Sequence, residues 1–176
     1  MQDVMVDIET LDVRPTAVIL SIGAVRFDAQ GDRFGDSFHV HIDIDSNLNM
    51  GRTVSGSTLL WWLDQNEQAR QRLVEAKRVT LPVALHRLSK FITEQDRVWG
   101  NGAAFDNVII ADAFRMCGIQ LPWRFWNDRC YRTLAAQNKH IPKTRTGVAH
   151  DALDDALTQA QHLQQILGSG DKEAVA

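Results

Sequence analysis

Residues 3–9 read DVMVDIE, a short run of valine, methionine and isoleucine that also carries carboxylates. A second run rich in β-branched residues, VILSIGAVRF at 18–27, follows after a loop that contains Pro15. Short runs of this composition, separated by a turn, are typical of consecutive strands. Residues 38–42 continue with alternating apolar and polar side chains. The first quarter of the chain therefore predicts three successive strands in an antiparallel meander.

The pattern then changes to helical spacing. Apolar side chains three and four residues apart predict helices at 59–63, 67–76, 80–92, 105–116 and 151–167, and a further strand at 98–100. Strands first with helices interleaved later indicate an α/β fold. We expect one domain at residues 1–168, whose last helix stops at Gly168, and a flexible C-terminal tail at 169–176.

Size and cysteine content bound the class of protein. A chain of 176 residues and 19.8 kDa can bury a core large enough to fold without disulfides. The only two cysteines, Cys117 and Cys130, have no C-x-x-C spacing, which favours a reducing compartment and argues against a zinc knuckle. The first ten residues carry acids where a secretory signal carries basic residues, and no apolar run is long enough to span a membrane. We therefore expect a soluble, cytoplasmic protein.

The net charge restricts how the chain could bind nucleic acid. Lysine and arginine number 19 against 22 aspartates and glutamates, which gives a net charge of −3. The chain thus lacks the global positive field that drives non-specific binding to duplexes. Any contact with nucleic acid must be local or mediated by metal ions.

Two acids on the first predicted strand are the first candidate site. Residues i and i+2 of a strand face the same way, so Asp7 and Glu9 present two carboxylates on one side. Clustered carboxylates repel one another unless a cation compensates them, and an all-oxygen set favours Mg²⁺ or Mn²⁺ over zinc. The alternative, a solvent-facing pair on an edge strand, stays open on these two residues alone.

Three further residues extend this pattern. Asp106 stands at the start of a predicted helix, and His150 precedes the last helix, in which Asp155 follows five residues later. Taken singly, acids in a first helical turn usually interact with the helix dipole, and a lone histidine is usually structural. Those readings explain the five residues poorly when they are taken together.

The joint pattern resembles a known superfamily. DIET at 7–10, FD at 105–106 and HDALDDA at 150–156 resemble, in order and spacing, the three motifs of the DEDDh (DnaQ-like) 3′-5′ exonucleases. STLLWWL at 57–63 and FWNDRCYRT at 125–133 resemble the phage DexA-type and exoribonuclease-like branch. The resemblance implies a ribonuclease H-like fold with a mixed, mainly five-stranded central sheet flanked by helices. The chain departs from it at Gly102, where many members have asparagine, and at Cys130, where some have an acid.

The resemblance also implies roles for the catalytic residues. The metal ligands would be Asp7, Glu9, Asp106 and Asp155, with Asp7 bridging two divalent cations, Mg²⁺ or Mn²⁺, about 3.5–4 Å apart. His150 would be the general base that takes a proton from the attacking water. The products would be nucleoside 5′-monophosphates.

Candidate substrate contacts surround these motifs. In the family, residues after the first-motif glutamate often touch the terminal sugar. In this chain, two tryptophans are adjacent, and the more exposed of them could stack on a base. Basic residues in the loop at 138–147 could hold the backbone of a single strand. The corresponding residues are Thr10, Leu11, Trp61, Trp62, Lys143 and Arg145. An ordinary loop, core packing and a solvated loop are the respective alternatives.

We therefore expect a metal-dependent 3′-5′ exonuclease that acts on single-stranded 3′ ends, with DNA slightly favoured over RNA. A 3′-5′ exoribonuclease or oligoribonuclease is the alternative, and a homodimer is one option, as in some relatives. A catalytically silent nucleic-acid-binding module should lack one of the five residues, all of which this chain keeps. A phosphatase with an aspartate nucleophile would need a second aspartate where Glu9 stands. Nothing in the sequence favours a proofreading subunit.

Overall fold

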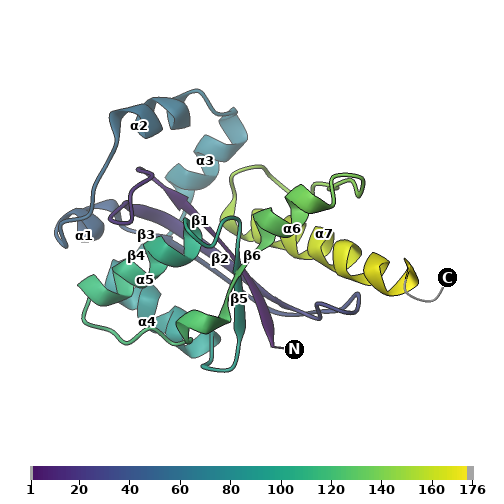
Figure 1. Ribbon diagram of the computed structural model, residues 1–176. Helices are drawn as coiled ribbons and strands as arrows, with labels where there is room; N and C mark the ends of the chain where they lie inside the picture. The colour runs from purple at the N-terminus through teal and green to yellow at the C-terminus, as the bar shows by residue number, and fades with distance from the viewer. Residues whose placement is uncertain (1, 174–176) are drawn as a thin grey trace.

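The computed structural model describes residues 2–173, except for the side chains of residues 75 and 169–173, and contains a six-stranded mixed sheet with helices on both faces (Figure 1). The strands are β1 (Asp3–Thr10), β2 (Ile19–Phe27), β3 (Phe34–Ile42), β4 (Arg78–Val79), β5 (Arg97–Gly100) and β6 (Asp128–Cys130). Their order across the sheet is β4-β3-β2-β1-β5-β6. The prediction of an α/β fold with a mixed central sheet is confirmed.

The first three strands form the predicted antiparallel meander, and the other three join the sheet in parallel. The sheet has one strand more than the mainly five expected. The two edge strands, β4 and β6, contain two and three residues. Runs of that length show no periodicity, so no sequence pattern could predict them.

The helices are α1 (Ile44–Leu48), α2 (Gly56–Leu63), α3 (Glu67–Glu75), α4 (Leu81–Phe91), α5 (Asp106–Met116), α6 (Tyr131–Gln137) and α7 (Ala152–Glu173), with a 3₁₀ turn at Phe125–Asn127. The five predicted helices are confirmed, whereas the short α1 and α6 were not predicted. The predicted stop at Gly168 is wrong, because α7 continues to Glu173. A helical glycine costs only about 1 kcal/mol relative to alanine, so it need not end a helix. Residues 174–176 of the predicted tail lie outside the described residues.

Helices lie on both faces of the sheet and beyond one end of β1. Figure 1 shows α4 and α5 on one side, α6 and α7 on the other, and α2 with α3 beyond the end of β1. Within residues 2–173, no helix combines the length and apolar character needed to cross a membrane.

Alternation along β1 decides where its carboxylates lie. Val4, Val6 and Ile8 join the core under α4 and α5, whereas Met5 joins the core under α6 and α7. Asp7 and Glu9 share the parity of Met5, so they lie on the α7 side of a central strand. Both residues are only 7% exposed, which excludes the alternative of a solvent-facing pair on an edge strand.

A glycine lets α7 reach these carboxylates. Gly23 of β2 pairs with Asp7, and a Cβ at residue 23 would lie 2.2 Å from the carbonyl carbon of Ala152. Only a residue without a side chain permits this approach. The start of α7, with the third sequence motif, is thereby packed directly beside β1.

Candidate active site

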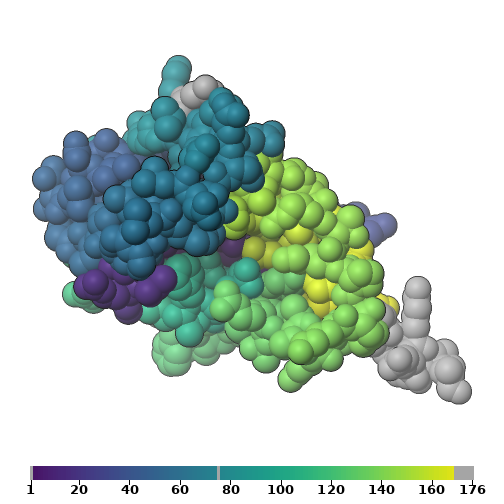
Figure 2. All heavy atoms as spheres, turned by 90° about the horizontal axis from the view of Figure 1, so that it is seen from above, coloured from purple at the N-terminus to yellow at the C-terminus, as the bar shows by residue number. Residues whose placement is uncertain are grey.

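The five predicted catalytic residues meet in one cleft of about 410 Å³ at the end of β1. Figure 2 looks onto this end of the molecule, where the surface is hollowed between the blue α2–α3 region and the green segment near residue 140. The cleft is lined by Asp7, Ile8, Glu9, Trp61, Asn101, Phe105, Asp106, Arg132, Lys143, Arg145, His150, Asp155, Thr158 and Gln159. Side chains from five separate parts of the chain thus converge on one place.

Burial and mutual repulsion make the carboxylates reluctant to ionise. Burial raises the pKa of Asp7 well above its usual range, and the charges of Asp106 and Glu9 add to the effect. Burial likewise raises the pKa of Glu9, with further contributions from Asp155 and Asp106. The pKa of Asp106 is raised to about 7, chiefly by burial. A set of acids held in this way gains most from a bound cation, which favours the charged forms.

Donor chemistry also fits hard divalent cations. The Oδ2 atom of Asp106 is buried and has no hydrogen-bond partner among the described residues. Glu9, His150 and Asp155 each offer a ligand atom, and these atoms lie within 4.8 Å of one another. Carboxylate oxygens are the ligands that Mg²⁺ and Mn²⁺ prefer. Glu9, His150 and Asp155 therefore form a group that could hold a metal ion, with the carboxylates of Asp7 and Asp106 lining the same cleft.

His150 occupies a turn immediately before α7, and its backbone has a φ of 64°, in the left-handed region that non-glycine residues rarely adopt. Its backbone N–H donates to Asp155 Oδ2 at 3.2 Å. Its imidazole ring makes T-shaped contacts with the rings of Trp61 and Trp62, whose centroids are 4.9 Å and 6.1 Å away, respectively. The histidine is thus contacted by α7 from its backbone side and by α2 from its ring side.

Three of the six predicted substrate contacts line the cleft, and the other three do not. Trp61, 44% exposed, lines the cleft together with Lys143 and Arg145, and the Arg145 guanidinium pairs with Asp155. Trp62 is 5% exposed, and its indole N–H donates to the Thr10 carbonyl at 2.8 Å. Of the two rings, Trp61 is therefore the one exposed in the cleft.

Thr10 and Leu11, the two residues after Glu9, are both largely buried. Thr10 lines an adjoining pocket of about 390 Å³, but its hydroxyl donates to the Asp12 carbonyl at 2.7 Å. Leu11 is 7% exposed, packs in a core cluster with Trp62, and lines neither the cleft nor the adjoining pocket. The structure does not bring the Leu11 side chain together with the catalytic residues.

Several residues that line the cleft were not predicted. Gln159 donates to Asp7 Oδ1 at 2.7 Å. It follows Asp155 by four residues on α7, so helical spacing could have identified it. Arg132 comes from the unpredicted α6 and donates to the Asn101 carbonyl at 2.7 Å, and only the fold reveals that it lies beside β5.

Comparison of the sequence with protein families gives one result that covers most of the chain. The family described as the 3′-5′ exoribonuclease Rv2179c-like domain matches residues 2–167. No curated protein sequence matches the chain.

Solved structures share the fold at low sequence identity. The nuclease domain of 3′hExo, a DEDDh family member bound to rAMP, has a TM-score of 0.61 and 14% identity, over 96% of this chain and 92% of that one. Cell-death related nuclease 4 (CRN-4) has a TM-score of 0.61 and 17% identity, over 96% and 64%. Exonuclease I of E. coli, in complex with a dT13 oligonucleotide, has a TM-score of 0.68 and 14% identity, over 97% and 42%.

These likenesses show the fold, which is the ribonuclease H-like arrangement implied by the sequence motifs. The chain spans less than two thirds of the length of CRN-4 and less than half that of exonuclease I. The match over residues 2–167 assigns the family: the chain belongs to the 3′-5′ exoribonuclease Rv2179c-like domain family and has the fold of the DEDDh exonucleases.

Proposed function

We propose that the chain is a metal-dependent exonuclease that removes nucleotides one at a time from the 3′ end of single-stranded nucleic acid and releases nucleoside 5′-monophosphates. One observation carries the proposal: Asp7, Glu9, Asp106, Asp155 and His150 converge in one cleft. The burial of these acids, and the raised pKa of Asp7, Glu9 and Asp106, support a role that needs compensating cations.

The four carboxylates would hold two divalent cations, Mg²⁺ or Mn²⁺. When bound, such ions would stabilise negative charge on the phosphate and lower the pKa of a bound water molecule toward neutrality. Gln159 would orient Asp7 through their 2.7 Å hydrogen bond. This assignment is consistent with the lack of a hydrogen-bond partner for Asp106 Oδ2 in the described part of the chain.

His150 would act as the general base and accept the proton of the attacking water at an imidazole nitrogen. The Trp61 face would stack on the terminal base, because every base has a π-face and this ring is the exposed one. Lys143, Arg145 and Arg132 would meet backbone phosphates, since all three line the cleft. Local positive charge of this kind is compatible with a net charge of −3.

We propose RNA as the preferred substrate, in place of the slight preference for DNA that we expected before the family was known. The family description names an exoribonuclease, and it covers nearly the whole chain. One structural neighbour binds rAMP and another binds dT13, so the fold itself accepts both sugars. A cytoplasmic location and a homodimer stay predictions.

A gel time course tests the proposal. RNA and DNA strands of one sequence, labelled at the 5′ end, would be incubated with Mg²⁺ or Mn²⁺ and with wild type, Asp7→Asn or His150→Ala. We expect a ladder that shortens from the 3′ end, faster on RNA, and absent with either variant or with EDTA. Faster digestion of DNA would overturn the sugar preference alone. Intact strands in every sample would overturn the proposed nuclease activity. Equal activity in wild type, Asp7→Asn and His150→Ala would also overturn it.

A further inference from the structure

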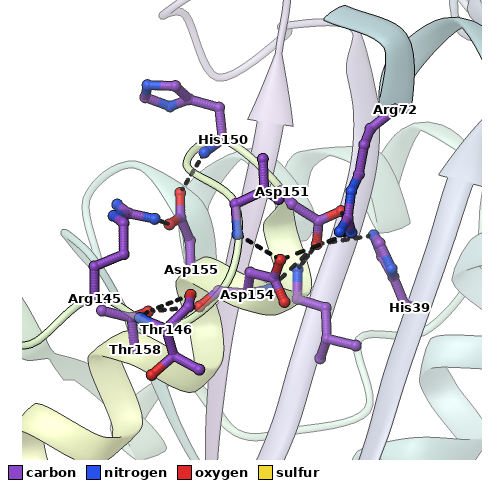
Figure 3. A network of polar contacts seen from close by, with 11 residues as sticks. His39, Arg72, Arg145, Thr146, His150, Asp151, Asp154, Asp155 and Thr158 are labelled. Carbon is purple, nitrogen blue, oxygen red and sulfur yellow. Dashed lines mark hydrogen bonds and ion pairs between the residues drawn. The ribbon is translucent and has the colours of Figure 1, made fainter. Parts of the chain in front are cut away.

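Arg72 of α3 faces the turn that carries His150. Its Nη1 atom lies 2.9 Å from Asp151 Oδ2 and 3.7 Å from Asp154 Oδ2. Figure 3 shows the guanidinium directed at these two carboxylates, with the His150 ring pointing away from them. Arg72 lines neither the cleft nor the adjoining pocket. It therefore contacts the catalytic turn without belonging to the catalytic surface.

The two carboxylates that Arg72 joins build the turn. Asp151 is 4% exposed, and its Oδ1 atom accepts the backbone N–H groups of Leu153 and Asp154, each at 3.2 Å. It thus caps the first turn of α7. Asp154 Oδ2 accepts the backbone N–H of Val148 at 2.8 Å, which closes the segment on the other side of His150. One guanidinium consequently pairs with two of the carboxylates that accept backbone N–H groups around the histidine.

His150 needs such support because its backbone is strained. A residue with a Cβ at a φ of 64° stays there only when its surroundings hold it. The neighbouring Asp151 carboxylate is buried, and the other cationic candidate near it, His39 Nε2, is 3.9 Å away. Burial lowers the pKa of His39, so Arg72 supplies the dependable positive charge. Loss of one partner leaves a buried charge poorly compensated and favours rearrangement of the turn.

The neighbouring helices α2 and α3 contact the ring of His150 and the residue that follows it, respectively. Trp61 and Trp62 on α2 contact its ring, and Arg72 on α3 holds the carboxylate of the next residue. One continuous segment, α2–α3, therefore contacts the histidine ring and a carboxylate of the turn that carries it.

We propose that Arg72 is a positioning residue that fixes His150 in its working conformation through the Asp151 and Asp154 carboxylates. The inference rests on the proposed exonuclease function, in which His150 is the base. Because Arg72 does not line the cleft, its loss should change the chemical step and leave substrate binding nearly unchanged.

Steady-state kinetics on a 5′-labelled oligonucleotide would test this inference. We expect Arg72→Gln to lower kcat by at least about tenfold while KM changes by less than about twofold, since a small misplacement of a catalytic group can reduce the rate about 100-fold. Arg72→Lys should recover most of the lost kcat, because an ammonium can still pair with Asp151. Arg115→Gln removes an arginine paired with Asp112 on α5 and is the matched control, with wild-type kinetics expected.

A second variant keeps the test valid if Arg72→Gln folds poorly. Asp151→Asn can still cap α7 but loses the ion pair, so it should lower kcat with little change in KM. The double variant Arg72→Gln, Asp151→Asn should be no slower than the slower single variant, because the two residues act as one unit. Hydrogen exchange of the amides at 147–152 should accelerate in Arg72→Gln and stay unchanged in Arg115→Gln.

The outcomes separate the two proposals. An inactive wild type, or a His150→Ala variant as active as wild type, would overturn the exonuclease function. An active wild type and an inactive His150→Ala, together with a fully active Arg72→Gln, would overturn the positioning role alone. The positioning role would also be overturned if Arg72→Lys lost as much kcat as Arg72→Gln. It would be overturned as well if Arg72→Gln raised KM by the same factor by which it lowered kcat.

Discussion

Replacement of Asp106 by asparagine should stabilise the protein at alkaline pH without divalent cations, although it removes a proposed metal ligand. Burial raises the pKa of Asp106 from 3.8 to about 7. Between these pH values the folded protein binds more protons than the unfolded chain, so the free energy of unfolding falls as pH rises. Asparagine has the same shape and no charge, and it escapes this penalty.

The size of the effect follows from the pKa difference. It is roughly 3 units, each worth about 1.4 kcal/mol, so the penalty reaches about 4 kcal/mol above pH 7. At pH 5 it is only roughly 2 kcal/mol, because the buried carboxyl is then protonated and only the unfolded chain is ionised. One kcal/mol shifts the Tm of a chain of this length by about 2–4 °C, so the gain at pH 8 is at most about 8–16 °C.

Thermal unfolding in EDTA at pH 5 and pH 8 would measure this gain. Asp112→Asn is the matched control: Asp112 lies on the same helix but pairs with Arg52 and Arg115, so its loss should not stabilise the protein. Addition of Mn²⁺ should raise the Tm of wild type more than that of Asp106→Asn, because a ligand stabilises the state that binds it. A Tm gain that is absent at pH 8, or equal at both pH values, would refute the reasoning.

Three further substitutions probe the cleft and the turn before α7. Arg145→Gln should tighten Mn²⁺ binding in calorimetry, because the guanidinium pairs with Asp155, and should raise KM; an unchanged affinity for Mn²⁺ would contradict this competition. Trp61→Ala should raise KM roughly tenfold with little loss of Tm, as expected from a stacking energy of about 1–3 kcal/mol per base, and an unchanged KM would exclude stacking. Gly147→Ala should lower both kcat and Tm, since a Cβ there would lie 2.2 Å from the Asp154 Cγ atom at a φ of +70°; wild-type behaviour would show that the turn can adapt.

The part of the site that follows from local periodicity could be predicted from the sequence. Asp7 and Glu9 share one face because a strand alternates, and Asp106 and Asp155 lie in first helical turns because the flanking patterns are helical. The spacing of the three motifs then indicated a known superfamily, which the match over residues 2–167 confirms at the family level.

Contacts between distant segments could not be predicted in this way. Arg72 and Asp151 are 79 residues apart, and nothing in a helical charge pattern distinguishes an arginine paired with a buried carboxylate from a fully solvated one. The burial of Leu11 depends on Trp62, and the position of Arg132 depends on the three-residue strand before it. Each requires the strand order of the sheet, which the sequence pattern does not contain.

The polarity of digestion tests the central claim most directly. One RNA strand would be labelled at its 3′-terminal nucleotide and, in a parallel sample, at its 5′ end, then incubated with wild type and Mn²⁺. We predict that the 3′ label appears at once as a nucleoside 5′-monophosphate, while the 5′ label shortens stepwise and only later reaches the smallest products. Early release of the 5′ label, internal fragments, or retention of both labels in the intact strand would contradict a 3′-5′ exonuclease.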